Sequence, residues 1–191
     1  MAQIELRTWF GRQLSTRRGA QQLEEKLSRL PSGTAFEGDW LPTLGVYFVS
    51  EITFTGTVWS RQDRGRIEFS QPAKPEKADI EILDYPPDDW RLEVFLNGDR
   101  VVAITQPDEV TTAIDLRSHG YEERIEMLKK VVARIDHPDV RMLPAAEADF
   151  RRAYEDWKLH EFAEGVVIKQ RQSQYPTLGG LAWKKHLYEW D

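Results

Sequence analysis

A short apolar run between two opposite charges is the feature that most constrains this chain. Residues 164–169 read Glu-Gly-Val-Val-Ile-Lys, and Trp183-Lys184-Lys185 follows shortly afterwards. Valine and isoleucine favour extended backbone, so the run predicts a short buried strand with Glu164 at one end and Lys169 at the other. Glu164 suits a divalent metal, which prefers hard oxygen ligands, and Lys169 suits a phosphate. Lys184 and Lys185 can add positive charge for the same phosphate.

The composition favours one domain over residues 1–191. A chain of this length buries roughly 70% of the surface that its unfolded form exposes, so it needs no disulfide or metal to fold. It contains no cysteine, which excludes disulfide scaffolds, thiolate zinc sites and cysteine nucleophiles. No apolar run approaches the roughly 20 residues of a membrane span, and the N-terminus lacks the apolar core of a signal peptide. We therefore expect a cytoplasmic protein with no membrane partner.

The charge balance limits how this chain can contact nucleic acid. Its formal net charge is −6, whereas non-specific binding to long nucleic acids usually needs a basic surplus. Contacts must then come from local basic clusters, of which Arg17-Arg18 and Lys184-Lys185 are the obvious ones. The four histidines show no metal-ligand spacing.

Hydrophobic periodicity predicts an α+β fold with a largely antiparallel core. Helices are expected at 20–30, 121–135 and 145–162. Their buried faces are expected to carry Leu23, Leu27 and Leu30, then Ile125, Leu128, Val132 and Ile135, then Phe150, Tyr154 and Trp157. Strands are expected within 46–59, 79–85, 91–104 and 140–143, and 70–77 is expected to be a loop. Asn97-Gly98 is a strong hairpin signal, so 92–96 is expected to turn and pair with 100–104.

Several further segments follow one another in a recognisable order. Thr16-Arg17-Arg18-Gly19 resembles a Ser-Arg-x-Gly motif, and residues 33–41 resemble Leu-Asp-Gly-Glu-Leu, with Asp39 in the place of the glutamate. Residues 148–169 resemble a helix that runs into Glu-Gly, three apolar residues and Lys. Ser173-Gln174-Tyr175 and Trp183-Lys184-Lys185 resemble Ser-x-Tyr and Trp-x-Lys-x-Lys. From about residue 12 onwards, the chain thus resembles the nucleotidyltransferase domain that ATP-dependent DNA ligases, RNA ligases and mRNA capping enzymes share.

This resemblance implies a ligase-like adenylation domain, with mixed, mostly antiparallel sheets flanked by helices and a nucleotide cleft between the sheets. It implies ATP and Mg²⁺ as ligands, and transfer of AMP through a lysine–AMP intermediate to the 5′ phosphate of nicked or broken DNA or RNA ends. Carried over residue by residue, it makes Lys169 and Lys185 catalytic, assigns ATP contacts to Arg17, Asp39, Glu164, Lys169, Lys184 and Lys185, and assigns the metal to Asp39 and Glu164.

The chain also departs from the family pattern. The nucleophile motif Lys-x-Asp-Gly, expected just ahead of Thr16, is absent from the sequence, so the domain is expected to be truncated at its N-terminus. The family's Phe-Asp, whose ring stacks on the purine, is replaced by Leu83-Asp84 or Leu92-Glu93. No OB-fold is expected after the last motif. A separate chain could supply the nucleophile segment or the OB-fold.

Three interpretations follow from the sequence. The first is an ATP-dependent polynucleotide ligase, with DNA as the favoured substrate over RNA, whose nucleophile lies outside this chain. The second is a catalytically inactive ligase-like domain that binds nucleotides or nucleic-acid ends, or serves in assembly. The third is a structural α+β domain that resembles the family by chance. A covalent lysine–AMP product separates the first from the others, because nucleophilic catalysis needs a positioned amine.

Overall fold

The computed structural model describes residues 3–14, 19–58, 66–175 and 182–190. In chain order, its elements are β1 (Ile4–Thr8), α1 (Ala20–Lys26), β2 (Thr34–Leu41), β3 (Val46–Val58), β4 (Glu76–Lys77), the 3₁₀-helix η2 (Ile80–Asp84), β5 (Trp90–Leu96), β6 (Asp99–Thr105), β7 (Thr111–Asp115), α2 (Tyr121–Ile135), β8 (Val140–Met142), β9 (Ala145–Ala146), α3 (Phe150–Trp157), β10 (Ala163–Gln170) and β11 (Trp183–Leu187).

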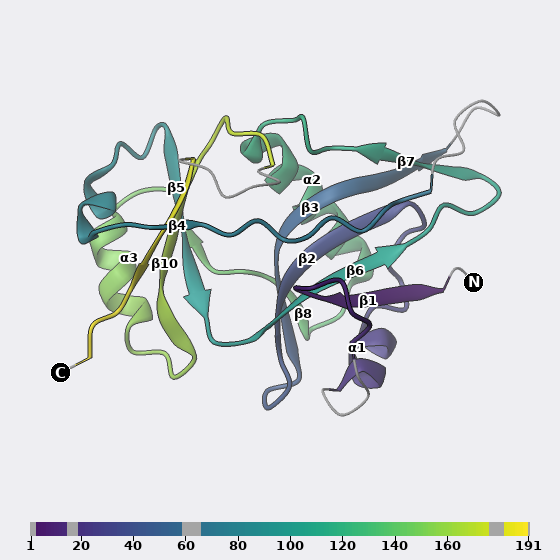
Figure 1. Cartoon of the computed structure of the whole chain (residues 1–191), viewed down its shortest axis with the longest axis horizontal. Helices are drawn as coiled ribbons and strands as arrows, with labels where there is room; N and C mark the ends of the chain where they lie inside the picture. Colours follow the sequence, from purple (N-terminus) through teal and green to yellow (C-terminus); the bar gives the residue numbers. More distant parts are fainter. Residues whose placement is uncertain (1–2, 15–18, 59–65, 176–181, 191) are drawn as a thin grey trace.

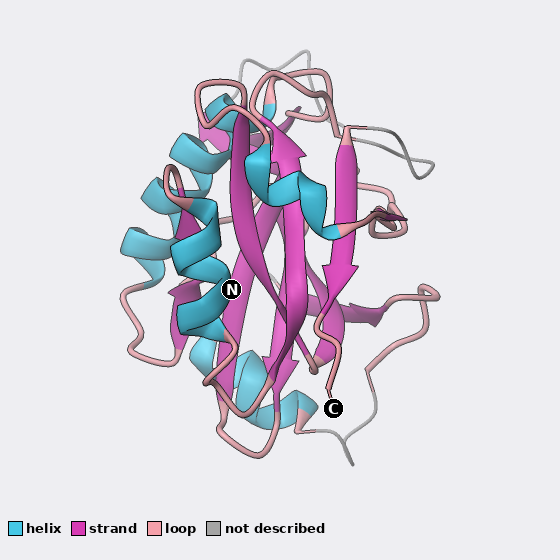
Figure 2. Ribbon diagram, turned by 90° about the vertical axis from the view of Figure 1, so that its left-hand side faces the viewer, coloured by secondary structure: helices cyan, strands magenta, loops and turns pink. Residues whose placement is uncertain are grey.

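The strands form two sheets that lie next to each other (Figure 1). The six-stranded sheet has the order β1-β6-β2-β3-β7, and β8 also pairs with β3. The five-stranded sheet has the order β4-β11-β10-β5-β9. Antiparallel pairing predominates, and β8 with β3 and β4 with β11 are parallel pairs. Helices pack beside the strands (Figure 2), so the predicted mixture of helices with largely antiparallel sheets is confirmed.

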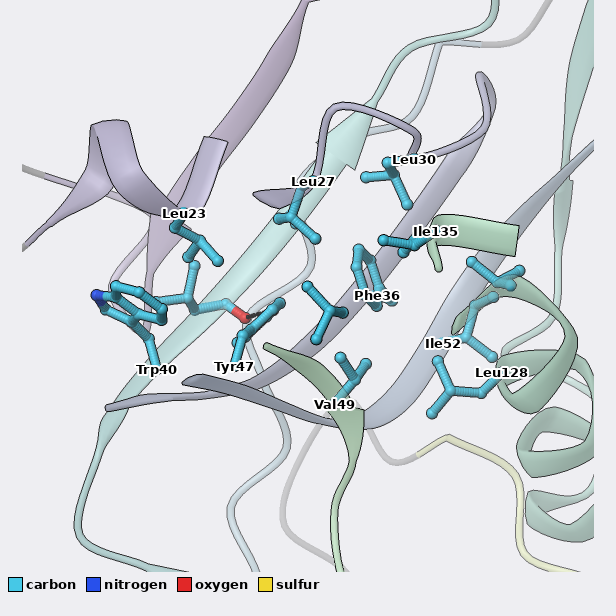
Figure 3. Packing of buried hydrophobic residues seen from close by; sticks show 14 of the residues in the cluster. Leu23, Leu27, Leu30, Phe36, Trp40, Tyr47, Val49, Ile52, Leu128 and Ile135 are labelled. Atoms are coloured by element: carbon cyan, nitrogen blue, oxygen red, sulfur yellow. Dashed lines mark hydrogen bonds between the residues drawn. The ribbon is translucent and has the colours of Figure 1, made fainter. Parts of the chain in front are cut away.

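The six-stranded sheet packs one face against α1 and α2. Leu23, Leu27 and Leu30 are buried there, as the periodicity predicts, and they lie over Phe36 and Tyr47 (Figure 3). The helix itself is shorter than expected, because α1 ends at Lys26 and Leu30 lies beyond it. On the same face the hydroxyl of Tyr47 donates a hydrogen bond of 2.7 Å to the carbonyl oxygen of Val101.

Helix α2 has the predicted bounds, Tyr121–Ile135. Ile125, Leu128 and Ile135 are buried as predicted, but Val131 takes the buried position expected for Val132. The first turn also buries two polar side chains, Tyr121 and Arg124. Apolar spacing alone could not place these two, because their burial depends on partners from other elements.

The five-stranded sheet packs against α3, where Phe150 and Tyr154 are buried as predicted. The helix begins at Phe150, so the expected start near residue 145 is wrong. Ala145 and Ala146 instead form β9, which pairs with β5. Asp149 adopts a left-handed conformation (φ 51°), which separates this short strand from the helix. Trp157, expected to be buried, is half-buried at the end of α3.

The expected hairpin around Asn97-Gly98 is not formed. The two flanking strands belong to different sheets: β5 pairs with β10 and β9, and β6 pairs with β2 and β1. The tight turn therefore carries the chain from one sheet to the other. Residues 79–85 are also not a strand, because Ile80–Asp84 form the 3₁₀-helix η2.

Within the described ranges, none of the helices has both the length and the apolar character needed to span a bilayer.

Candidate functional site

A cavity of about 170 Å³ lies between the two sheets. Its polar lining comes from both of them: Asp39, Ser50 and Arg100 from the six-stranded sheet, and Glu93 and Lys169 from the five-stranded sheet. Aromatic lining is supplied by Trp9, Phe95 and Trp183. Ala73 and Pro75, from the loop before β4, also contribute. The site is therefore assembled from segments far apart in the sequence.

Strand geometry brings the six-stranded sheet's charges together. Glu37 and Asp39 are two positions apart on β2, so their side chains share one face. Arg100 is the register partner of Asp39 on β6. Its guanidinium contacts Glu37 Oε1 at 2.8 Å, Ser50 Oγ at 2.8 Å and Asp39 Oδ2 at 3.6 Å. Burial by itself would lower the pKa of Arg100, but the two carboxylates outweigh it and raise that pKa.

Asp39 ionises close to neutral pH. Burial raises the pKa of its carboxyl group from 3.8 to about 6, the Arg100 cation opposes the rise, and the Glu93 carboxylate adds to it. Asp39 is therefore largely ionised at pH 7 but ready to take up a proton in mild acid. Mg²⁺ is often held by one or two carboxylates together with phosphates and water, and an ionised Asp39 fits such a role.

The five-stranded sheet contributes a second buried set of charges. Lys169 Nζ lies 3.0 Å from Glu93 Oε1, and each side chain is less than 5% exposed. Lys169 Nζ also lies 3.9 Å from the ring centroid of Trp183, a cation–π contact. Glu93 accepts further hydrogen bonds from the Tyr121 hydroxyl and, at 3.5 Å, from Arg91. Burial raises the pKa of Glu93, but the cations of Lys169 and Arg91 prevail and lower it.

The cations at the cavity are already ion-paired with carboxylates. Arg100 binds Glu37 and Asp39, while Lys169 binds Glu93. A phosphate that enters the cavity must therefore compete with these carboxylates for Arg100 and Lys169. The existing ion pairs are hard to break, because each buried charge left without a partner would keep its large desolvation cost. The cavity is also smaller than the roughly 300–1,000 Å³ typical of small-molecule sites. A nucleotide can enter only if the two sheets or their side chains rearrange.

The structure brings some of the predicted site residues together and separates others. Asp39 and Lys169 line the same cavity. Glu164 is exposed where β10 has an irregular register, and it does not line this cavity. Arg17 lies outside the described residues. Of the two candidates for the family's Phe-Asp, Leu92-Glu93 directs its carboxylate to the cavity, whereas Asp84 is exposed and pairs with Arg151.

Lys184 and Lys185 do not act on one ligand together, because consecutive strand residues face opposite sides of a sheet. Lys184 Nζ lies 2.8 Å from the Tyr85 hydroxyl. Lys185 Nζ lies 4.9 Å from the ring centroid of Phe95, a residue that lines the cavity. Lys185 alone of the pair is thus placed next to the cavity.

Sequence reasoning did not single out Arg100, which lines the cavity, or Glu37, which binds the Arg100 guanidinium. The available signal was strand parity: Arg100 is an even number of residues from Val102 and Ile104, so all three side chains lie on the same face of β6. A charge at a position expected to face inwards indicates a buried ion pair or a functional group.

Metal-binding geometry is not evident from the protein side chains alone. No cluster of three or more His, Cys, Asp or Glu in the described part of the chain could hold a metal ion. Among known proteins, no family model matches this chain, and no curated protein matches it significantly. Any functional assignment must therefore rest on the motifs and on the geometry of the cavity.

Proposed function

We propose that this chain is a ligase-like adenylation domain that binds ATP and Mg²⁺ in the cavity between its sheets. The AMP moiety would pass to the 5′ phosphate of a polynucleotide end, with DNA favoured over RNA. One observation supports this most strongly. The motif segments on β2, β5, β10 and β11, far apart in the sequence, each contribute a lining residue to one cavity: Asp39, Glu93, Lys169 and Trp183.

The proposal assigns a task to each group. Asp39 would hold Mg²⁺ together with the phosphates of ATP, as single carboxylates commonly do. Lys169 and Arg100 would contact phosphate oxygens, stabilising negative charge where it develops. Trp9 and Phe95 offer aromatic surface for the base. Because both cations are paired with carboxylates, ATP binding is expected to shift Lys169 away from Glu93.

A second function, a ligase-like domain that binds nucleotide without forming a covalent adduct, is favoured by the state of Lys169. It is the one lysine among the described residues that line the cavity. A nucleophilic amine must be free to reach the reacting phosphate, yet the Lys169 amine is buried against Glu93 and Trp183. Such a domain would sense ATP or position a nucleic-acid end.

One experiment tests both functions. The chain is incubated with ATP and Mg²⁺, its intact mass is recorded, and ATP affinity is measured by calorimetry. The same measurement is made on a version extended upstream in its own reading frame, because this sequence lacks Lys-x-Asp-Gly. AMP added to the extended version supports the ligase function, whereas ATP binding without added mass in both versions supports the non-covalent function. Asp39→Asn and Lys169→Met should weaken binding, while Lys130→Gln on the exposed face of α2 should not. If ATP does not bind at all, both proposals are wrong.

A further inference from the structure

We propose that Lys74, Lys77 and Lys185 form a phosphate-binding site at the outer edge of the five-stranded sheet, next to the cavity. This inference rests on the proposed function for the identity of the ligand, a nucleotide or a polynucleotide. It adds a binding element from the segment at residues 73–78, which the sequence motifs do not include. The ligand group is a phosphate, either from the tail of a nucleotide or from a nucleic-acid strand.

Strand pairing places two of these lysines side by side. β4 is the edge strand of the sheet and pairs in parallel with β11, with Lys77 in register with Lys185. Register partners on neighbouring strands direct their side chains to the same face. The backbone N–H of Ala78 donates a 2.8 Å hydrogen bond to the Lys185 carbonyl oxygen and fixes this register. Glu76 is the partner of Lys184 and belongs to the opposite face.

The third lysine, Lys74, is exposed in the segment that leads into β4, three residues before Lys77. Burial lowers the pKa of Lys185, and the cations of Lys74 and Lys77 lower it further, while Glu164 opposes them. The cluster also adjoins the cavity, since Ala73 and Pro75, on either side of Lys74, line it. Phe95 joins the two sites, because it lines the cavity and lies under the Lys185 ammonium.

The cluster has no counter-charge in direct contact. Among the described residues, no carboxylate comes within ion-pairing distance of Lys74, Lys77 or Lys185, whereas Lys169 and Lys26 each have one. Like charges opposite each other on paired strands destabilise a sheet. A bound phosphate would remove this repulsion, and several ammonium groups around one anion are a common way to bind phosphate. The arrangement of the three lysines thus favours binding of an anion at this edge of the sheet.

The test uses the full chain and a double variant, Lys74→Gln/Lys77→Gln, in which both substituted side chains are exposed. Inorganic tripolyphosphate is the first probe, measured by calorimetry. We expect the wild type to bind it and the double variant to bind at least about tenfold more weakly. Lys130→Gln, an exposed lysine of α2, is the matched control and should bind like the wild type. Circular dichroism confirms that all variants are folded.

Further probes identify the source of the phosphate. If the double variant also weakens ATP binding but not AMP binding, the site takes the nucleotide tail. If it leaves ATP unaffected but weakens a 5′-phosphorylated oligonucleotide relative to the 5′-hydroxyl form, the site takes a nucleic-acid end. In that case, a plot of log affinity for the oligonucleotide against log salt concentration should have a shallower slope for the double variant than for the wild type. The slope should change by about 0.7 for each single-strand phosphate that the variant no longer neutralises.

The inference is overturned if the wild type does not bind tripolyphosphate, or if the double variant binds every probe as the control does. Failure of the proposed function gives a different result. If ATP binds no better than tripolyphosphate, the adenylation function is wrong although the lysine site remains. If ATP binds tightly while the double variant has no effect, the lysine site alone is wrong.

Discussion

Asp39 is the carboxylic acid of the cavity whose charge depends most on pH near neutrality. Its side chain is 13% exposed, and burial raises its pKa to about 6. Between pH 4 and pH 6 the folded protein therefore binds more protons at this position than the unfolded chain does. By linkage, this group's contribution to stability is present in acid and is lost as pH rises through about 6.

Replacing Asp39 with asparagine should remove this pH dependence. The quantity to follow is the free energy of unfolding of Asp39→Asn minus that of the wild type. We expect this difference to increase by about 2 to 3 kcal/mol from pH 4 to pH 7, because the wild type loses stability over this range. Urea unfolding at several pH values measures the difference. Asp88→Asn, in an exposed turn, is the control and should follow the wild-type profile. Parallel profiles for Asp39→Asn and the wild type would show that Asp39 does not titrate in this window.

At the scale of single elements, the pairing of β10 with β11 leaves no room for a side chain at Gly165. A Cβ atom there would lie 2.2 Å from the His186 carbonyl oxygen and 2.8 Å from Leu187 Cα. These are backbone atoms of the paired strand, so they cannot move aside as a flexible side chain could. The glycine of the Glu-Gly motif thus serves strand packing, whatever ligand the neighbouring residues bind.

Gly165→Ala should therefore displace β11. Overpacking of this kind costs about 1–3 kcal/mol or more, and we expect the free energy of unfolding in urea to fall by at least that amount. Because β11 carries Trp183 and Lys185, tripolyphosphate binding should weaken too. Gly120→Ala is the matched control, since its Cβ would lie closest to the flexible side chain of Gln172, at 3.3 Å, and at an ordinary contact distance of 3.6 Å from the Gln172 backbone. Equal effects of the two substitutions would contradict this interpretation.

The elements also show which features the sequence can predict. Helix α2 was predictable because its apolar spacing and its length are local properties of residues 121–135. The turn at Asn97-Gly98 was predictable too, but the partner of β5 was not. A local turn signal does not determine which strand pairs with which, and β10, which is distant in sequence, supplied the partner. Lys184 and Lys185 are a different case, because alternation along a strand is a local rule and already assigns adjacent lysines to opposite faces.

The candidate site was predictable in the same partial way. Asp39 and Lys169 were found because they stand in short motifs on single strands. Arg100, which pairs with Glu37 and Asp39, was missed because the role of a charge in a strand depends on the other strands that face it. Ionic contacts between strands are properties of the whole fold, and one sequence by itself contains no direct record of them.

At the scale of the whole molecule, the cavity depends on how firmly the two sheets are joined. Each has its own core, but one short segment pairs with both, through β8 with β3 and β9 with β5. Between these strands, the Leu143 N–H donates to the Val49 carbonyl oxygen at 2.9 Å, and the Val94 N–H donates to that of Pro144 at 3.2 Å. The two sheets are therefore connected by backbone hydrogen bonds.

Arg124 adds a second connection. Its fully buried guanidinium contacts Glu51 of β3 at 2.7 Å and the carbonyl oxygen of Ser173, just after β10, at 2.9 Å. Removing one partner of a buried ion pair costs about 3–5 kcal/mol, because the other charge is left unpaired. Arg124→Met should therefore destabilise the protein strongly, and its effect should extend to both sheets rather than to the six-stranded sheet alone.

We accordingly expect the protein to unfold in a single cooperative transition. Tryptophan fluorescence should change together with far-ultraviolet circular dichroism, because Trp40 lies in the core of the six-stranded sheet and Trp183 lies in the five-stranded sheet. Hydrogen exchange tests the coupling directly: in Arg124→Met, protection of the slowest amides in β3 and in β10 should fall by the same free energy. If protection falls in β3 while β10 is unchanged, the sheets unfold independently. The cavity between them would then be free to open without global unfolding, and a nucleotide could enter by separating the sheets.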